Sequence, residues 1–230
     1  GQTLRRPFSL LDVLDDDSGR FDLLVHDGGS GAHGLVSLVA GSGVEVLGPL
    51  GNGFDPPTPD RTVIAVGGGY GLAPFHFALT AWRRQMDPST ADLAVIAGSR
   101  SIRELPFLPL LQTALEAWPR AEVVLTTDDG SLGVKGRVTD SLAPMLTRMI
   151  DEGRSPIVYA CGPMRMMQAL QAVAERFHVP TRLSLEAAMA CGYGVCDGCV
   201  VPIRDPKRGE TRYSRICVEG TVVPGDLVVW

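Results

Sequence analysis

The chain has 230 residues, of which 45% are hydrophobic, and a formal net charge of -5. This length is enough for one large core or two medium ones. Because acidic and basic residues are interleaved, no basic stripe can follow a phosphate backbone, so we expect no binding to nucleic acid. No apolar run approaches the roughly 20 residues of a membrane span, and the first residues lack a secretory pattern, so we expect a cytoplasmic protein without membrane contact.

The first part of the chain predicts β structure. Short strand-like runs at residues 6–10, 21–25 and 44–47 are separated by glycine and aspartate, and no stretch with helical periodicity interrupts them. The stiff, polar sequence from Asp55 to Asp60 is typical of a domain boundary. We therefore expect a β domain over residues 1–58.

From Arg61 onward, apolar runs alternate with amphipathic segments. The expected strands are 62–66, 93–97, 123–125 and 157–159, and the expected helices are 74–84, 107–117, 138–150 and 164–177. This alternation predicts a parallel sheet with helices on its faces, over residues 59–180. After Pro180 the pattern stops and glycine and cysteine become frequent, which predicts a small domain over residues 181–230 that a metal centre stabilises.

Four of the five cysteines lie in this last segment. Cys191, Cys196 and Cys199 follow the spacing C-x4-C-x2-C, and Cys217 comes after 17 intervening residues. This is the ligand arrangement of a plant-type [2Fe-2S] cluster, and the glycines of the loop allow its backbone to approach such a cluster closely. A structural Zn(Cys)4 site, which usually has two short knuckles, and a pair of disulfides remain as alternatives.

A glycine-rich loop directly follows the first strand of the α/β region and begins its first helix. Such a loop brings backbone close to a pyrophosphate at a helix N-terminus. It is not the Rossmann fingerprint, because Pro74 stands in place of the third glycine, and a tight structural turn remains an alternative. The expected nucleotide-binding residues of the loop are Gly67, Gly68, Gly69, Gly71 and Pro74.

The later strands also end in small or polar residues, which gather at one edge of such a sheet. The nucleotide-binding residues expected there are Gly98, Arg100, Asp128, Gly162, Pro163 and Met164. Arg100 would pair with a 2'-phosphate and so indicate NADP, although an exposed arginine is often only a solvated charge. Cys161 at the same edge is the candidate catalytic residue, and a buried cysteine that acts as a small hydrophobe is the alternative.

Taken in chain order, the motifs resemble the ferredoxin-NADP reductase superfamily, and within it the electron-transfer subunits of dihydroorotate dehydrogenase B. The resemblance rests on residues 6–9, 48–54, 67–74, 127–131 and 161–164 and on the cysteine cluster. It implies a multidomain α/β and β protein: an FAD-binding antiparallel β-barrel that is short at its N-terminus, a parallel α/β nicotinamide-binding domain and a small C-terminal [2Fe-2S] domain.

The resemblance also implies which residues bind FAD. They are Arg6, Pro7, Phe8, Ser9, Leu24, Val25, His26, Gly31 and Ala32. Arg6 would meet the flavin pyrophosphate, and its neighbours would line the isoalloxazine. Ala32 stands where the family usually has threonine, so a hydroxyl is lost. The family has several barrel strands before the arginine motif, whereas five residues precede it here, so we expect native residues to be missing from the given sequence.

The implied function is electron transfer in a heteromeric complex of pyrimidine biosynthesis. The partner is an FMN-containing dihydroorotate dehydrogenase catalytic subunit, and electrons would pass from it through the cluster and FAD to NAD (or NADP). Two alternatives remain: a related reductase subunit of a hydrogenase or ferredoxin:NADP oxidoreductase complex, and a cluster-bearing interaction module without flavin.

Overall fold

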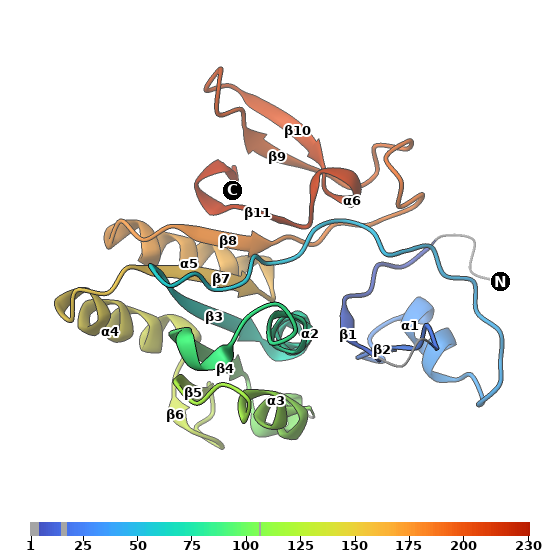
Figure 1. The fold of residues 1–230 in the computed structure, drawn as a ribbon. Helices are drawn as coiled ribbons and strands as arrows, with labels where there is room; N and C mark the ends of the chain where they lie inside the picture. Colours follow the sequence, from blue (N-terminus) through green and yellow to red (C-terminus); the bar gives the residue numbers. More distant parts are fainter. Residues whose placement is uncertain (1–4, 15–17, 106) are drawn as a thin grey trace.

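One mixed sheet dominates the computed structural model, which describes residues 5–14, 18–105 and 107–230. In that part of the chain, seven strands pair in the order β11-β8-β7-β3-β4-β5-β6 (Figure 1). They are β3 (Thr62–Gly68), β4 (Leu93–Ser99), β5 (Ala121–Thr127), β6 (Val134–Lys135), β7 (Pro156–Cys161), β8 (Thr181–Ser184) and β11 (Val222–Pro224). All neighbouring strands are parallel except β11 and β8. The predicted parallel α/β sheet is confirmed.

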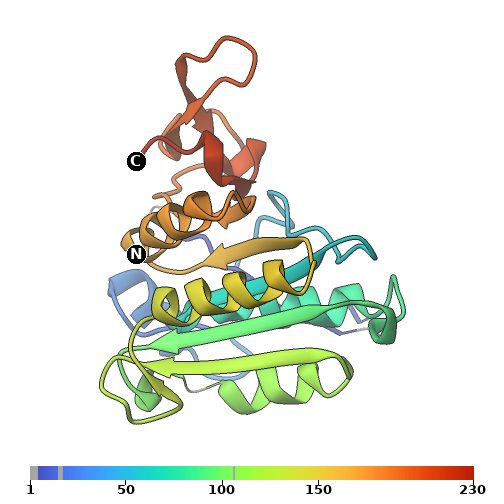
Figure 2. The ribbon, with the colours of Figure 1, turned by 90° about the vertical axis from the view of Figure 1, so that its left-hand side faces the viewer.

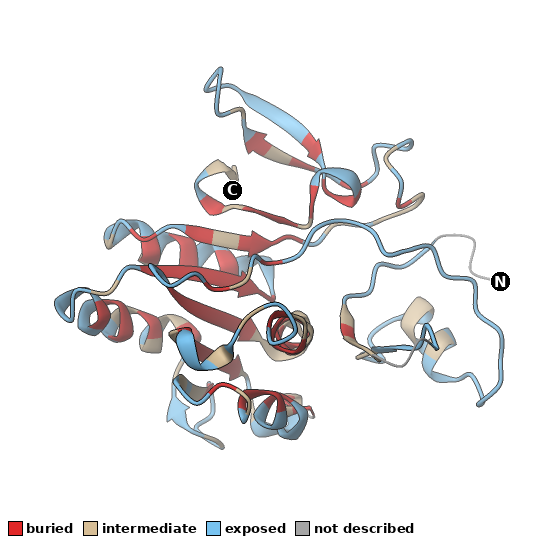
Figure 3. Cartoon of the chain, viewed as in Figure 1, coloured by how far each residue is buried: buried red, intermediate tan, exposed pale blue. Residues whose placement is uncertain are grey.

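Helices cover both faces of this sheet (Figures 1 and 2). The helices α2 (Ala73–Trp82) and α3 (Leu108–Leu115) lie on one face, and α4 (Val138–Asp151) and α5 (Met164–Arg176) lie on the other. Side chains alternate along β3: Val63 and Ala65 enter the core beneath α2 and α3, whereas Ile64 and Val66 enter the core beneath α4 and α5. The central strands are therefore buried on both sides, as Figure 3 shows.

Short 3-10 helices join several of these elements. They are η1 (Gly69–Leu72), η2 (Pro88–Thr90), η3 (Ile102–Glu104) and η4 (Gly225–Leu227). The first connects β3 to α2 through the glycine-rich loop, and the third follows the end of β4. Every helix in the described ranges is too short or too polar to cross a bilayer.

The N-terminal module, residues 5–54, differs from the predicted run of three strands. The strands β1 (Leu10–Val13) and β2 (Phe21–Leu23) pair antiparallel, and the helix α1 (Ser30–Val36) follows them. Strand β1 therefore begins at the last residue of the predicted strand 6–10. The helix α1 was not predicted. Two glycines interrupt α1 and none of its residues is buried, so neither propensity nor periodicity marks it in the sequence.

The predicted strand at residues 44–47 is wrong. This segment is extended, but it pairs with no strand in the part of the chain that the structure describes. Its side chains Val44, Val46 and Leu47 are exposed. A strand needs a hydrogen-bonded neighbour as well as β-forming residues, and the sequence pattern shows only the second.

Hydrogen bonds attach the N-terminal module to helix α2. The buried His76 donates from Nδ1 to the Leu11 carbonyl at 2.8 Å, and the Thr80 hydroxyl donates to the Asp12 carboxylate at 3.2 Å. These bonds tie β1 to the side of α2 that faces away from the sheet, so the module has a defined place beside the α/β domain (Figure 1).

Phe54 anchors the connection between this module and the sheet. Its ring stacks on Phe75 at 4.9 Å and on Tyr159 at 5.0 Å, centroid to centroid, and its carbonyl accepts a hydrogen bond from the Trp82 indole at 3.2 Å. The predicted boundary at residues 55–60 therefore comes directly after a residue whose ring and carbonyl are both held by the α/β domain.

The C-terminal segment contributes to the large sheet and also forms a separate hairpin. The hairpin strands are β9 (Val200–Arg204) and β10 (Thr211–Arg215), and the one-turn helix α6 (Ile216–Glu219) follows them. Because β8 and the edge strand β11 both belong to the large sheet, that sheet continues past the proposed boundary at residue 180.

Candidate functional site

The four predicted cluster cysteines are arranged as two pairs. Cys191 lies within hydrogen-bonding reach of Cys196, and Cys199 lies within reach of Cys217 on α6. All are free thiols, which removes the pair of disulfides. Within the described residues no group of three or more metal-ligating side chains converges on one point. Zinc needs four ligands around one ion, whereas a [2Fe-2S] cluster takes two cysteines on each iron, so the donor set fits the cluster better.

The backbone of the cysteine loop points N–H groups at sulfur. Hydrogen bonds from Tyr193 and Val195 lower the pKa of the Cys191 thiol to about 6, which favours the thiolate that binds iron. The turn requires positive φ at Gly192 and Gly194, of 82° and 84°. In contrast, burial and then Cys199 raise the pKa of Cys217 to about 11. Cys191 and Cys196 therefore lie in a polar loop, whereas Cys199 and Cys217 lie in the core.

The N-terminal module contacts this cysteine loop directly. A methyl group on Gly192 would lie 3.4 Å from Leu50 Cδ1, so the two are packed together. Asn52 forms two hydrogen bonds with the backbone of Val222: its Nδ2 donates to the carbonyl at 3.0 Å, and its Oδ1 accepts from the N–H at 2.8 Å. Segment 47–52 thereby fixes the cluster domain against the N-terminal module.

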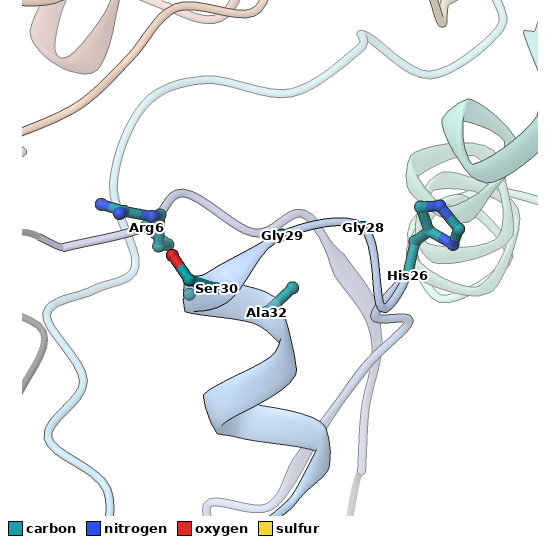
Figure 4. Close-up of a pocket in the computed structure, with 7 residues that line it drawn as sticks. Arg6, His26, Gly28, Gly29, Ser30 and Ala32 are labelled. Carbon is teal, nitrogen blue, oxygen red and sulfur yellow. The ribbon is translucent and has the colours of Figure 1, made fainter.

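A cavity of about 420 Å³ lies at the predicted flavin site (Figure 4). Its lining residues are Arg6, His26, Gly28, Gly29, Ser30, Gly31 and Ala32. A methyl group on Gly31 would lie 2.7 Å from Arg6 Nε, and one on Gly28 would lie 2.7 Å from the His26 ring, so these two side chains lie close against the glycine backbone. An arginine beside an open glycine backbone suits a pyrophosphate, so these residues fit the predicted flavin nucleotide.

The structure brings only part of the predicted flavin set into this cavity. Arg6, His26, Gly31 and Ala32 line it, whereas Pro7, Phe8, Ser9, Leu24 and Val25 lie outside its lining. Three lining residues were missed by the sequence analysis: Gly28, Gly29 and Ser30. The double glycine just before Gly31 was the available signal, since such a run leaves backbone N–H groups open to an anion.

The predicted nucleotide loop, residues 67–74, contains four glycines, and most of them permit protein packing rather than ligand contact. A methyl group on Gly71 would overlap the Cys161 carbonyl, and one on Gly68 would lie 2.6 Å from the Met166 sulfur. These two glycines let the loop lie against the turn after β7. The interpretation of the loop as a tight structural connection therefore holds for these positions.

Gly69 is the open position of the loop. Its φ is 55°, and the nearest atom to a methyl group placed there is the Glu104 carbonyl oxygen at 4.0 Å. Pro74 follows as the second residue of α2, where its missing N–H leaves no helical bond unmade. Of the four predicted loop glycines, Gly69 is the one where an added methyl group would meet no atom closer than 4.0 Å.

Cys161 ends β7 beside the nucleotide loop, in register with Gly67 and Ser184. The residue is 5% exposed. Burial raises the pKa of its thiol to about 12, and a hydrogen bond with Ser184 opposes that shift only in part. The thiol is therefore neutral at physiological pH, which suits a positioning group and not a nucleophile or a proton donor.

The remaining predicted nucleotide residues lie at the carboxyl ends of the strands, as expected. Gly98 is a packing position, because a methyl group there would overlap Val138. The Asp128 N–H donates to the Ser99 carbonyl at 3.1 Å. Gly162, Pro163 and Met164 form the turn into α5. Arg100 is ion-paired with Glu104, a residue that the sequence analysis missed although the i,i+4 spacing signals it.

Comparison with known proteins identifies two domains in this chain. The family model described as the iron-sulfur cluster binding domain of dihydroorotate dehydrogenase B matches residues 186–229, and that described as the oxidoreductase NAD-binding domain matches residues 65–172. Among solved structures, the NADH-dependent reduced ferredoxin-NADP oxidoreductase, which performs flavin-based electron bifurcation, is similar with a TM-score of 0.79 and 28% identity. That match covers 99% of this chain and 75% of the other.

A second similar structure is the cytochrome P450 reductase from Amycolatopsis, with a TM-score of 0.58 and 29% identity over 74% of this chain and 52% of that one. The predicted reductase fold and the expected cluster, flavin and nicotinamide cofactors are confirmed by these matches.

Curated relatives cover nearly the whole chain. The dihydroorotate dehydrogenase B (NAD(+)) electron transfer subunits of Desulforamulus reducens and of Caldanaerobacter subterraneus are each 34% identical to it over 227 residues. The alignments cover 99% of this chain and 80% and 81% of those relatives. The chain therefore belongs to the family of dihydroorotate dehydrogenase B electron-transfer subunits, which are components of an oxidoreductase.

Proposed function

We propose that this chain receives electrons released by dihydroorotate oxidation in an FMN-containing partner subunit and delivers them through a [2Fe-2S] cluster and FAD to NAD+. The observation that carries the proposal is the position of the N-terminal module. Leu50 of that module packs on the cysteine loop, and His26 lies 4.8 Å, ring centroid to ring centroid, from Tyr70 of the nucleotide loop. A flavin held by the module would therefore stand between the cluster and the nucleotide.

The chain's own residues would position the carriers in that order. The four cysteines hold the cluster, Arg6 with the open backbone around Gly31 holds the flavin pyrophosphate, and Gly69 admits the nicotinamide nucleotide. Bound FAD supplies the exchange between two-electron hydride chemistry and one-electron transfer. Cys161 would fix the approach of the nicotinamide as a neutral, buried group beside the loop.

The partner is proposed on chemical grounds as well as family membership. The relatives are named electron transfer subunits, and electron transfer is a role distinct from the oxidation of dihydroorotate. We therefore place that chemistry on a separate catalytic subunit in a heteromeric complex, and we keep the cytoplasmic location expected from the sequence as part of the proposal.

The test is a visible absorption spectrum of the full-length chain purified without oxygen, with iron, zinc and released flavin measured on the same sample. We expect two irons and one FAD per chain and bleaching of the flavin absorption by NADH. Zinc without iron or flavin would overturn the proposal. Cys217→Ser should lose iron and keep FAD, whereas Cys161→Ala should keep both, so the pair of variants separates cluster loss from general misfolding.

A second candidate function is a subunit of a ferredoxin-NADP oxidoreductase complex, because the similar structure with a TM-score of 0.79 is of that class. The identity of the partner protein distinguishes the two candidate functions. Mixing the chain with a dihydroorotate dehydrogenase catalytic subunit should permit reduction of NAD+ by dihydroorotate, and reduction by ferredoxin alone would favour the second candidate.

A further inference from the structure

Arg100 and Glu104 form a two-point ion pair at the end of β4. Arg100 Nε donates to Glu104 Oε2 at 3.0 Å, and Arg100 Nη2 lies 2.7 Å from Glu104 Oε1. Both bonds use one edge of the planar guanidinium, which is one of the edges that can grip a phosphate with two parallel hydrogen bonds. This edge of Arg100 is therefore engaged by a carboxylate of the same chain.

The pair stands beside the open position of the nucleotide loop. Glu104 ends η3, and its carbonyl oxygen is the atom nearest to a methyl group placed on Gly69. Strand β4 is the immediate parallel neighbour of β3, with Gly98 opposite Gly68. In dinucleotide-binding sheets this is the place that distinguishes the two cofactors, because a carboxylate there suits the 2'-hydroxyl of NAD and an arginine suits the 2'-phosphate of NADP.

Negative charge dominates around this arginine. The pKa of the Arg100 guanidinium is raised by its hydrogen bond to Glu104, then by the charge of Glu104 and, more weakly, by that of Asp128. A 2'-phosphate carries close to two negative charges and would meet both carboxylates, while one edge of the arginine is already engaged by Glu104. The sequence prediction that Arg100 indicates NADP considered the arginine without this partner.

We propose that Glu104 is the specificity-determining residue that makes this site select NAD over NADP, by engaging one edge of Arg100 and repelling a 2'-phosphate. The inference rests on the proposed nicotinamide site and names its substrate class. Glu104 need not contribute to hydride transfer, so its effect appears as a ratio between two nucleotides and not as a change of chemistry.

The test compares kcat/KM for NADH and NADPH in the full-length flavin-loaded chain, with ferricyanide as electron acceptor. In Glu104→Gln the NADPH/NADH ratio should rise about tenfold or more, because one like charge is removed from close range and the ion pair that holds Arg100 is weakened to a neutral hydrogen bond. This gain should shrink as salt concentration rises. A matched control is Glu152→Gln, which removes the carboxylate of another exposed i,i+4 arginine pair, Arg148–Glu152 at 3.3 Å on α4, and should leave the ratio unchanged.

A second variant and a binding measurement test whether the change in the NADPH/NADH ratio depends on the Arg100–Glu104 ion pair. In Arg100→Leu/Glu104→Gln the gain should disappear, because the arginine is the group that holds the phosphate. Calorimetric titration with adenosine 2',5'-bisphosphate should show tighter binding to Glu104→Gln than to the wild type, whereas 5'-AMP should bind both alike. This readout does not depend on turnover.

The possible failures are distinguishable. If Glu104→Gln oxidises NADH with an unchanged NADPH/NADH ratio, or if the wild type prefers NADPH, the specificity inference is overturned and the proposed electron-transfer function stands. If the wild type oxidises neither nucleotide and binds neither adenosine probe, the proposed nicotinamide site itself is overturned.

Discussion

The ring of His26 lies 4.8 Å from the ring of Tyr70, centroid to centroid, at an interplanar angle of 42°. His26 lines the proposed flavin cavity, and Tyr70 belongs to the nucleotide loop, so this contact joins two sites that lie more than forty residues apart in the chain. It gives the first of the predictions below.

Replacing Tyr70 with alanine should slow reduction of the bound flavin by NADH. An aromatic contact of this kind contributes about 0.5–1.5 kcal/mol, so loss of positioning should reduce the rate roughly 2- to 10-fold. Stopped-flow absorption of the flavin measures it. Tyr70→Phe keeps the ring and should react at nearly the wild-type rate, and equal rates for Tyr70→Ala and the wild type would show that the contact is only packing.

Replacing Asn52 with alanine should loosen the cluster domain. Asn52 makes two hydrogen bonds with the Val222 backbone, and their loss should cost about 1–3 kcal/mol. The midpoint of urea-induced loss of the cluster absorbance should fall accordingly. Asn52→Asp keeps the acceptor for the Val222 N–H and loses the donor, so an intermediate midpoint is expected, and an unchanged midpoint in both variants would contradict this role.

Replacing Gly71 with alanine should destabilise the α/β domain. The added methyl group would overlap the Cys161 carbonyl, and a clash with backbone in a packed loop costs roughly 1–3 kcal/mol. The melting temperature followed by circular dichroism should drop. Gly43→Ala is the matched control, because a methyl group there meets no atom within 4 Å; a similar drop for both would rule out the packing explanation.

Replacing Cys161 with alanine should slow reduction by NADH without loss of the cluster absorbance. The buried side chain lies beside the nucleotide loop, and small errors in position can cost up to about a hundredfold in rate, so we expect a fall of roughly tenfold or more. Single-turnover reduction by NADH measures the rate, and an unchanged rate would end the proposal that Cys161 positions the nicotinamide.

The same cysteine predicts a loss of stability in alkali. Its thiol has a pKa raised from 9.0 to about 12, mainly by burial, so the folded state keeps a proton that the unfolded state releases. The resulting stabilisation is complete below pH 9 and is lost as pH rises from 9 towards 12. Between pH 8 and pH 10 the free energy of unfolding should fall about 1 kcal/mol more in the wild type than in Cys161→Ala. Parallel urea titrations check this, and equal losses would contradict it.

The sequence by itself determined the cysteine site and the α/β sheet. The spacing of Cys191, Cys196 and Cys199 is a local property, because a short loop must wrap the ligands around one cluster. The strands β3, β4, β5 and β7 and the four helices around them were also predictable, because burial on both faces leaves continuous apolar runs and helical burial leaves a 3.6-residue period.

Only the tertiary structure decided the role of each residue that the sequence pattern singled out. Gly71 is glycine because the Cys161 backbone lies against it, the segment at 44–47 stays unpaired because no described strand lies beside it, and Arg100 is paired with Glu104. Each of these outcomes depends on a neighbour that the pattern of a single segment does not contain. Local periodicity reports how a residue is buried, whereas its partner, and therefore its charge and accessibility, is set when distant segments meet.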